Sequence, residues 1–362
     1  MPRHHHSRVV MTNLPKPGDT YKTKKDKYEI VELVGKGGFG AVFKVKRHSD
    51  GMMLAMKCED VNARKPVIQM DCKVLRGAQC LGSQHFCELV DRGLCLHSCR
   101  FLIMSLVGKN LWDLRVERDE LHFSLGTALK AAEQSLEALE HLHRVGFLHR
   151  DVKPGNFAIG RAENMMNHTI YLIDFGLCRQ FGTPSKDIRL PRASAPFRGT
   201  TRYAPITALR EHEQSRKDDI ESWLYVVVEW TSGALPWHKL RGSNKAEVLR
   251  WKIDVRFGDA LDEFLINCPR REFESVLNYI DSLEYQSIPD YDHIYYCLQH
   301  AAKVNNIARD EPLDWDPNNR YHGPQVDLTK RKKEKEEDKK IGEPLIAPIL
   351  RNHHPPSISN KN

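Results

Sequence analysis

A short polar run near the middle of the chain, Leu148 to Asn156, has the residue types that catalyse phosphate transfer. Within it, Asp151 is followed by Lys153 two residues later and by Asn156 five residues later, in the pattern H-R-D-x-x-x-x-N. Such a carboxylate accepts the proton of an attacking hydroxyl, while a lysine beside it contacts the transferred phosphate. An amide oxygen is a suitable ligand for Mg²⁺. The run therefore predicts phosphoryl transfer to a hydroxyl group, with Asp151 and Lys153 as catalytic residues and Asn156 as a metal ligand.

A second acidic run follows at a defined distance. Eighteen residues beyond Asn156, the segment Asp174-Phe175-Gly176 comes directly after the apolar residues Ile170 to Ile173. A carboxylate at the end of a buried strand, in the same chain as the first run, completes a pair of oxygen ligands for a divalent ion. We therefore predict Asp174 as the second ligand of Mg²⁺.

A glycine-rich run near the N-terminus, Gly35 to Val42, fits G-x-G-x-x-G-x-V. A strand follows it, whereas a dinucleotide-binding motif requires a helix there, and the Gly-Lys-Ser/Thr of a P-loop is missing. What remains is a hairpin whose backbone amides close over phosphates, with Lys57 on the next strand placed to hold the α- and β-phosphates. Met104, near the end of a later apolar strand, is placed to border the adenine. The predicted nucleotide-binding residues are Gly35, Gly37, Gly38, Gly40, Val42, Ala55, Lys57, Met104 and Leu106.

A third polar segment, Gly199 to Tyr203, is typical of a loop that receives the substrate residue. Thr200 is placed to hydrogen-bond both Asp151 and Lys153, so we count it among the catalytic residues. Asp219, at the start of an apolar helical stretch, is expected to brace the backbone of the catalytic loop.

The elements that position these residues change character along the chain. Strand-like alternation begins at Tyr28, and Asp50-Gly51 is a hairpin signal. From Leu125 to Leu142 apolar residues recur at three and four residues, with Ser124 placed as the N-cap. The sequence therefore predicts an α+β fold of two lobes: a small β-rich N-lobe over residues 27–107 and a larger helical C-lobe over residues 108–318. Residues 1–26 are expected to form a flexible arm and residues 319–362 a charged, disordered tail; the alternative for that tail is a nuclear-import or partner-binding signal.

Composition sets the broad class. The chain has 362 residues, 40% of them hydrophobic and 28% charged, with a net charge of +7. No apolar run is long enough for a membrane span, and no signal peptide is recognisable. We therefore expect a cytoplasmic protein, with a nuclear location as an option, and neither a membrane nor a nucleic-acid partner; a monomer is expected. The nine cysteines are expected to be reduced.

One cysteine- and histidine-rich stretch is open to a second interpretation. Its members fall within fifteen residues, but no C-x-x-C pair is present, which favours ordinary strand residues over a zinc site. These members are His85, Cys87, Cys95, His97 and Cys99.

Several local runs together resemble the casein kinase I superfamily, and within it the tau-tubulin kinase branch. The resemblance covers roughly Tyr28 to Trp315. It implies a bilobal protein kinase fold, ATP with Mg²⁺ as cofactors, and transfer to serine or threonine of protein substrates. The runs that carry it are Val145 to Asp151, Asn156 to Ala158, Phe197 to Ala204, Gln214 to Asp219, Leu235 to Trp237, and Asp314-Trp315.

The resemblance also implies how substrates are recognised. From Asp174 to Ala204 there are six basic residues against two acidic ones, and enzymes of this superfamily bind acidic or phosphorylated substrates on such a surface. Arg202 is at the matching anion-binding position, with Lys239 as a possible helper. A solvated basic loop is the competing interpretation. Bidentate binding of phosphate by arginine gives the anion site its physical basis.

Two departures from the kinase pattern bear on activity. Ala204-Pro205 is followed by Ile206, so the glutamate of the usual buried Arg–Glu pair is missing. The helix after Lys57 offers Asp71 where a glutamate is expected, and this side chain is one methylene shorter. We predict an active but slower enzyme; a catalytically weak scaffold is the alternative, and a small-molecule kinase is a third hypothesis. Thr183, Ser185 and Ser194 lie in the segment between Asp174 and Ala204, and Arg150 is a candidate to bind a phosphate placed there. Such phosphorylation is not expected to be required.

Overall fold

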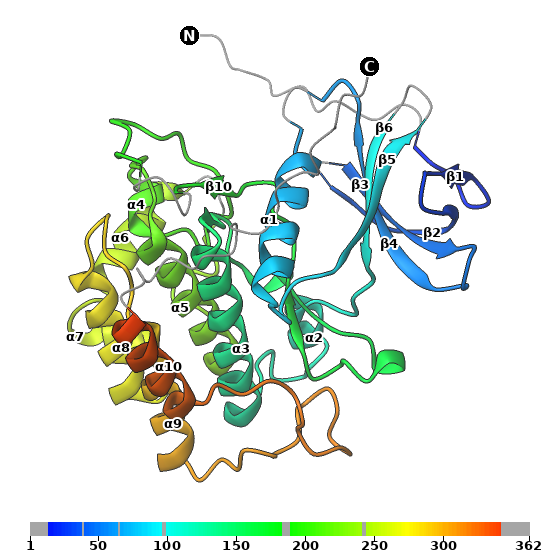
Figure 1. The fold of residues 1–362 in the computed structure, drawn as a ribbon. Coiled ribbons are helices and arrows are strands. Elements are labelled where there is room, and N and C mark those ends of the chain that lie inside the picture. Colours follow the sequence, from blue (N-terminus) through cyan, green and yellow to red (C-terminus); the bar gives the residue numbers. More distant parts are fainter. Residues whose placement is uncertain are drawn as a thin grey trace.

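The computed structural model describes residues 14–37, 40–63, 66–95, 99–182, 189–240 and 244–341. The first part of the chain forms a six-stranded antiparallel sheet in the order β1-β2-β3-β4-β6-β5, and most of the helices gather in the second part (Figure 1). The strands are β1 (Thr20–Lys22), β2 (Lys27–Gly37), β3 (Gly40–Arg47), β4 (Met53–Asp60), β5 (Leu89–Cys95) and β6 (Cys99–Ser105). The predicted bilobal α+β kinase fold is confirmed.

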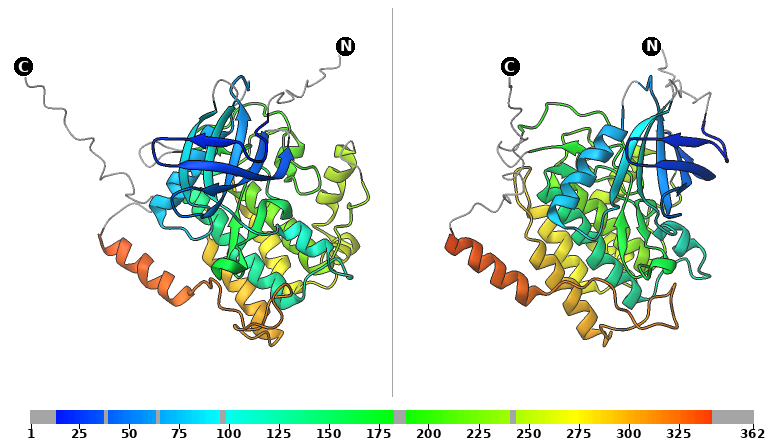
Figure 2. Two further views of the ribbon diagram at one scale, coloured as in Figure 1. Left: turned by 90° about the vertical axis from the view of Figure 1, so that its right-hand side faces the viewer. Right: turned by 45° about the vertical axis from the view of Figure 1, so that its right-hand side comes forward.

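Alternation of apolar side chains builds the sheet. In β3 every second residue is buried, as expected for a strand with one face on a core. The buried face includes Phe43 and Val45 of β3 with Met56 of β4 and Phe101 of β6. In β4 the six residues between its ends are all buried, because helix α1 (Ile68–Leu81) packs against the other face of the sheet (Figures 1 and 2).

The second lobe is built around α3 (Leu125–Arg144) and α5 (Arg216–Ser232). The Ser124 hydroxyl accepts a hydrogen bond from the Thr127 N–H at 3.2 Å, which confirms the predicted N-cap of α3. A bond of 2.9 Å from the Trp223 indole to the Ser135 hydroxyl joins the two helices. The other helices here are α2 (Leu111–Val116), α4 (Ile206–Leu209), α6 (Lys245–Asp254), α7 (Gly258–Phe264), α8 (Arg270–Ser282) and α9 (Tyr291–Val304).

Short elements between α3 and α4 carry the polar runs found in the sequence. They are strand β7 (Phe147–Leu148), the 3₁₀ turn Pro154–Asn156, strand β8 (Phe157–Ile159), the 3₁₀ turn Ala162–Asn164, strand β9 (Ile170–Leu172) and strand β10 (Arg179–Gln180). β7 pairs with β10 and β8 with β9, both antiparallel. The catalytic run therefore lies between β7 and β8, and the Asp174 run follows β9.

The predicted flexible arm is wrong over its last part. β1 pairs with β2 in antiparallel register, and Thr23 donates a hydrogen bond of 2.6 Å to Asp91 on β5. Leu14 also packs against the core of the sheet. Residues 14–26 are therefore part of the folded lobe. The short polar strand β1 forms one edge of the sheet, which composition did not indicate. Residues 1–13 lie outside the described residues.

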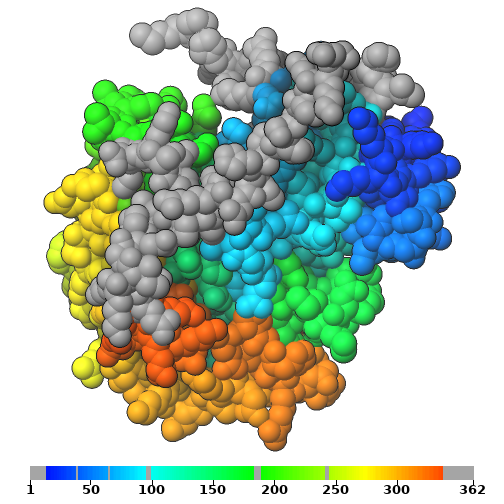
Figure 3. All heavy atoms as spheres, in the orientation of Figure 1, coloured from blue at the N-terminus to red at the C-terminus, as the bar shows by residue number. Residues whose placement is uncertain are grey.

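The predicted disordered tail is also wrong over its first part. Tyr321 and Val326 are buried, and helix α10 (Leu328–Ile341) follows and contacts α9 (Figures 2 and 3). Arg331 ion-pairs with Glu140 of α3 at 2.7 Å and also with Asp292. The charged run of the tail thus forms helix α10, which contacts acidic residues of the second lobe through Arg331. The domain therefore extends beyond residue 318. No helix among the described residues is long and apolar enough to cross a membrane.

Candidate active site

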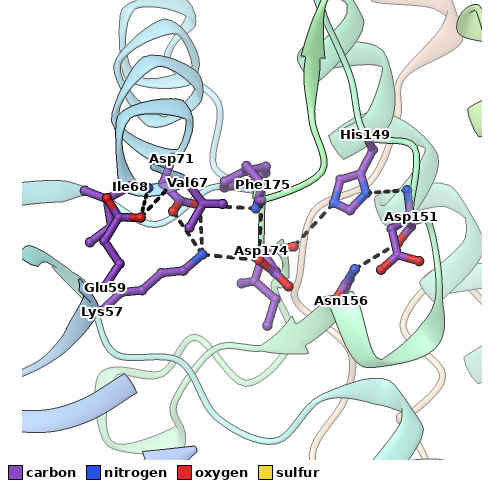
Figure 4. A network of polar contacts seen from close by, with 12 residues as sticks. Lys57, Glu59, Val67, Ile68, Asp71, His149, Asp151, Asn156, Asp174 and Phe175 are labelled. Atoms are coloured by element: carbon purple, nitrogen blue, oxygen red, sulfur yellow. Dashed lines mark hydrogen bonds and ion pairs between the residues drawn. The ribbon is translucent and has the colours of Figure 1, made fainter. Parts of the chain in front are cut away.

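The strand β4, the helix α1 and the segment after β9 bring together one lysine and two aspartates. Lys57 Nζ lies 2.9 Å from an Asp71 carboxylate oxygen and 3.2 Å from Asp174 Oδ1 (Figure 4). The Phe175 N–H donates to Asp71 Oδ1 at 3.2 Å, and the Phe175 ring is buried. Asp71 therefore reaches Lys57 in spite of its shorter side chain, and at the same time holds the backbone beside Asp174.

The charges of this group are coupled. Burial lowers the pKa of Lys57, but Asp71 and Asp174 outweigh it, so that the pKa is raised above its ordinary value. Burial acts to raise the pKa of Asp174, yet the Lys57 ammonium lowers it overall. Burial raises the pKa of Asp71, with Asp174 adding to the effect and Lys57 opposing it. Lys57 is therefore in its charged form and contacts the carboxylates of both Asp71 and Asp174. A positive charge suits a lysine that must contact phosphates.

The predicted catalytic residues meet on the loop after β7. Asp151 Oδ2 accepts a hydrogen bond from Lys153 Nζ at 2.6 Å, and Oδ1 accepts one from the Thr200 hydroxyl at 2.8 Å. Lys153 Nζ also lies 3.5 Å from Thr200 Oγ1. The structure therefore brings together the three side chains as the sequence predicts. Their contacts aim the Asp151 carboxylate and the Lys153 ammonium at the same region.

Two contacts fix the backbone of this loop. The carboxylate of Asp219 accepts hydrogen bonds from the His149 N–H at 2.7 Å and the Arg150 N–H at 2.8 Å, which confirms its predicted bracing role. Gly199 has φ 105°, and a Cβ there would lie 2.9 Å from the Arg150 carbonyl oxygen and 3.2 Å from Asp151 Oδ1. Only glycine therefore fits where the substrate loop crosses the catalytic loop.

The two predicted metal ligands have the chemistry that Mg²⁺ prefers. The Asn156 amide donates through Nδ2 to the Asp151 carbonyl at 2.8 Å, which leaves its oxygen as the acceptor end. Asp174 contributes a carboxylate whose side chain is 42% exposed, so that water and phosphate oxygens have access to it. One carboxylate and one amide oxygen, completed by phosphate and water, are a typical donor set for this ion. The residues present therefore fit the group.

The predicted nucleotide-binding residues lie on the sheet next to Lys57. Val42 is the register partner of Lys57, and Ala55 is that of Met104. A Cβ at Gly35 or Gly37 would meet no atom within 4 Å, so packing among the described residues does not require glycine there. Contact of these two glycines with a phosphate stays a prediction. Gly40, by contrast, has φ 143° and lies against the Cys58 carbonyl. Gly38 lies outside the described residues, and Leu106 directly follows β6.

An Arg–Glu pair lies behind the substrate loop, although the glutamate expected after Ala204-Pro205 is missing. Glu221 of α5 lies 3.2 Å from the Arg256 guanidinium and accepts a hydrogen bond of 3.1 Å from the Ile206 N–H. The hydroxyl of Tyr225 donates to the same carboxylate at 2.6 Å. A glutamate from the helix behind the loop therefore pairs with the arginine where the sequence indicated no pair. The sequence signal was weak, because Glu221 is one of several acidic residues at the start of α5.

A buried lysine supports the same loop. Lys252 of α6 is fully buried, and its ammonium donates to the carbonyl oxygens of Ala204 and Thr201. The ammonium lies 4.2 Å from the centre of the Tyr225 ring and 5.1 Å from that of Trp237. Burial lowers its pKa well below the usual value. The backbone of the substrate loop is thus attached to α6 by a residue that no motif marked.

Arg202, the predicted anion-binding residue, lies beside a carboxylate of the chain itself. Its guanidinium donates to Glu229 Oε1 at 3.2 Å and to the His238 carbonyl at 3.1 Å. Tyr203 shares Glu229 through a hydrogen bond of 2.6 Å. Lys239, which directly follows His238 in the sequence, is exposed. An anion-binding role for Arg202 and Lys239 stays a prediction, since Arg202 is already paired with a buried carboxylate.

Basic side chains do gather at another place beside the catalytic loop. A small surface pocket there has four arginines and one glutamate, a formal charge of +3. Glu213 lies 2.9 Å from Arg179 and also pairs with Arg192. We call this site the arginine pocket; its lining residues are Arg150, Arg179, Arg192, Ala195, Pro196, Arg198, Glu213 and Gln214.

The cysteine- and histidine-rich stretch does not form a zinc site in the part of the chain that the structure describes, where no group of three metal-ligating side chains occurs. His85 is buried, with Nδ1 at 2.8 Å from the Ile170 carbonyl oxygen and Nε2 at 2.9 Å from Glu137. Cys87 is a free, buried thiol, and His97 lies outside the described residues. His85 and Cys87 lie in the connection between α1 and β5, so the strand interpretation is wrong for these two residues, and their contacts are those of ordinary buried residues.

The expectation of reduced thiols is wrong at one position. Cys99 is disulfide-bonded, whereas seven other cysteines of the described residues are free. Cys99 begins β6 and is buried. The spacing of the cysteines gave no signal of this bond.

A curled sheet, a helical lobe and a lysine–aspartate pair facing an Asp–Lys–Asn loop define the class of protein kinases. The chain belongs to this family: its residues 28–275 match the protein kinase domain. It is 33% identical over 292 residues to a probable serine/threonine-protein kinase of Dictyostelium discoideum, an alignment that covers 81% of this chain and 57% of that protein. It is 35% identical over 303 residues to the serine/threonine-protein kinase spe-6 of Caenorhabditis elegans, covering 83% of this chain and 78% of that one. These relatives identify a protein serine/threonine kinase.

Proposed function

We propose that the chain transfers the γ-phosphoryl group of Mg-ATP to serine and threonine hydroxyls in acidic or already phosphorylated protein segments. The observation that carries the preference is the arginine pocket, whose member Arg150 directly precedes Asp151. Arginine pairs with phosphate and carboxylate through parallel hydrogen bonds. A negative group on the substrate would therefore bind within reach of the residue that accepts the hydroxyl proton.

The residues of the chain divide the reaction between them. Asp151 accepts the proton of the substrate hydroxyl, whose oxygen forms a bond to the γ-phosphorus as the bond to the departing ADP oxygen breaks. Lys153 stabilises the charge on the transferred group, and Lys57 holds the phosphates of the nucleotide. Asn156 and Asp174 would hold Mg²⁺, which would neutralise further phosphate charge.

The weak-scaffold hypothesis has less support. Its basis was the shorter side chain of Asp71, yet that carboxylate lies within 3 Å of Lys57 Nζ. Lys57, Asp151, Asn156 and Asp174 all have the contacts described above. These contacts support an active enzyme.

We also infer a finer family position, in the casein kinase I superfamily and its tau-tubulin kinase branch. The motifs quoted from the sequence carry it, together with the replacement of the usual Arg–Glu pair by Glu221 and Arg256. We also propose that the protein is monomeric and is located in the cytoplasm or nucleus.

The test is phosphate transfer by the purified chain from labelled Mg-ATP to matched peptides that are neutral, acidic or phosphorylated. We expect acidic and phosphorylated peptides to be preferred by about tenfold, as one charged contact of ~1.4 kcal/mol gives. Arg198→Ala should reduce this preference, whereas Arg320→Ala, a remote exposed arginine, should not. Equal rates on neutral and acidic peptides would overturn the preference. Transfer no higher than that of Asp174→Ala would overturn the activity and favour the scaffold.

A further inference from the structure

The N-terminus of α1 is held by a carboxylate from the neighbouring strand. Glu59 Oε2 accepts hydrogen bonds from the backbone N–H of Val67 at 2.7 Å and of Ile68 at 3.1 Å (Figure 4). Val67, in the N-cap position, makes no side-chain cap of its own, and valine is among the poorest residues there. Because the first N–H groups of a helix have no partner inside it, Glu59 supplies from β4 the cap that α1 lacks.

This carboxylate is deeply buried, which makes its contacts important. Glu59 is 1% exposed, and a buried charge is tolerated only with compensating partners. Two N–H groups, the positive end of the helix dipole and the Arg100 guanidinium at 3.7 Å provide them. Arg100 is the register partner of Glu59 on β6. The side chain is thus placed by the sheet and directed at the helix.

Lys57 and Glu59 act from the same face of one strand. They are two residues apart on β4, so their side chains point to the same side of the sheet. Lys57 reaches Asp71 in the first turn of α1, and Glu59 reaches the N–H groups at the start of that turn. The first turn is therefore attached to β4 at two points, and the Glu59 contact limits how far the helix can lie from the strand.

We propose that Glu59 is a positioning residue that compensates for the shorter side chain of Asp71. By holding the start of α1 against β4, it keeps the Asp71 carboxylate within 3 Å of Lys57 Nζ. A glutamate at position 71 would make the same contact from a helix that lies further from the strand. This inference rests on the kinase activity and adds a residue that no kinase motif contains. A displacement of on the order of 1 Å in such a site can lower the rate by about 10²-fold.

The test is a double-mutant cycle of Glu59→Ala and Asp71→Glu, with kcat/KM for ATP as the readout. Glu59→Ala should lower kcat/KM by about 10- to 100-fold. Asp71→Glu alone should be neutral or harmful, because the added methylene must fit between α1 and β4. In the Glu59→Ala background, Asp71→Glu should raise kcat/KM at least about fivefold. The effect of Asp71→Glu on kcat/KM would then change sign between the two backgrounds, which a merely structural role of Glu59 would not produce.

Hydrogen exchange gives a second readout that does not depend on turnover. The amides of Val67 and Ile68 should exchange at least about tenfold faster in Glu59→Ala, and Asp71→Glu should not restore their protection. Glu59→Gln, which keeps an acceptor of the same size, replaces Glu59→Ala should the latter fail to fold, with smaller effects in the same directions. The matched control is Glu32→Gln, an exposed glutamate of the same sheet paired with Lys44.

Two kinetic results would each overturn the proposal: wild-type kcat/KM in the single Glu59 variant, or a double variant no more active than Glu59→Ala. Unchanged exchange at Val67 and Ile68 would also overturn it. If the wild-type chain transfers no phosphate at all, the proposed function fails by itself, while the exchange measurement still decides whether Glu59 holds the helix.

Discussion

Asp71 of α1 contacts Lys57 of β4 at 2.9 Å and simultaneously accepts the Phe175 N–H at 3.2 Å. One short side chain therefore joins the helix, the strand and the segment that carries Asp174. A glutamate would place its carboxylate one methylene further from the helix axis. The arrangement implies that α1 lies close to β4, and that the pair is sensitive to any change that moves the helix outward.

The first prediction concerns this pair. Asp71→Asn keeps the shape of the side chain but removes the negative charge that orients the Lys57 ammonium, so kcat/KM should fall by about 10- to 100-fold. Steady-state kinetics with Mg-ATP and an acidic peptide measures the effect. Asp113→Asn is the matched control, since Asp113 is an exposed aspartate in the first turn of α2. An Asp71→Asn enzyme as fast as the control would show that the pair does not contribute.

The second prediction concerns activation. Glu213 already pairs with Arg179 and Arg192 in the arginine pocket, so that these arginines need no phosphate to neutralise them. Thr183 and Ser185 lie outside the described residues. We therefore expect the triple variant Thr183→Ala, Ser185→Ala and Ser194→Ala to keep wild-type activity. Kinetics on protein shown by mass spectrometry to lack phosphate provides the measurement.

The control for this prediction is Glu213→Ala, which leaves the two arginines without their carboxylate. Its activity should fall by about tenfold, the change that ~1.4 kcal/mol of lost transition-state stabilisation gives. Loss of activity in the triple alanine variant, with Glu213 intact, would contradict the explanation.

Much of the site followed from the sequence because kinase chemistry is concentrated in contiguous runs. The spacing of Asp151, Lys153 and Asn156 within one loop left little freedom for their relative positions. Thr200 and Asp219 were placed by their own motifs, and both make the contacts expected of them. A motif of this kind predicts a contact even across 49 or 70 residues of chain, because the residues around each member identify its role.

The parts that the sequence did not predict depend on residues that belong to no recognisable motif. Glu221 pairs with Arg256 across the second lobe, and Glu59 caps a helix that begins after a connecting loop. A glutamate in a strand or a helix gives no signal of such a role, since exposed glutamates are common there. The tail was mispredicted for a related reason: Arg331 finds Glu140, nearly two hundred residues away, and composition alone indicated a solvated segment.

The third prediction concerns stability. Glu221 and Arg256 form a buried pair, with side chains 3% and 8% exposed. Glu221→Ala leaves the Tyr225 hydroxyl and the Ile206 N–H without their acceptor, while Arg256 keeps its contact with Asp281 at 3.1 Å. The free energy of unfolding should therefore fall by about 1–3 kcal/mol. Urea denaturation provides the measurement. Glu163→Ala, which removes an exposed glutamate paired with Arg161, should show no measurable change, and a similarly small effect of Glu221→Ala would contradict the role assigned to the pair.

The fourth prediction concerns pH. His141 Nδ1 lies 2.8 Å from the Ser83 hydroxyl, and burial lowers the pKa of His141 to about 3, with the Glu137 carboxylate offsetting only part of this. In the unfolded chain the pKa of histidine is about 6.5, so below that pH the unfolded state binds a proton that the folded state excludes. The free energy of unfolding should therefore decrease as the pH falls, by about 1–2 kcal/mol between pH ~6.5 and pH ~5 from this residue.

His141→Gln should remove this contribution, because the amide can still hydrogen-bond Ser83 but does not titrate. Urea denaturation of both proteins at the two pH values measures the difference in slope. His48→Gln is the control: His48 is exposed at the end of β3, so its loss should leave the slope of the wild type unchanged. If the His141 variant loses stability on acidification as steeply as the wild type, the half-buried His141 imidazole is not the group responsible.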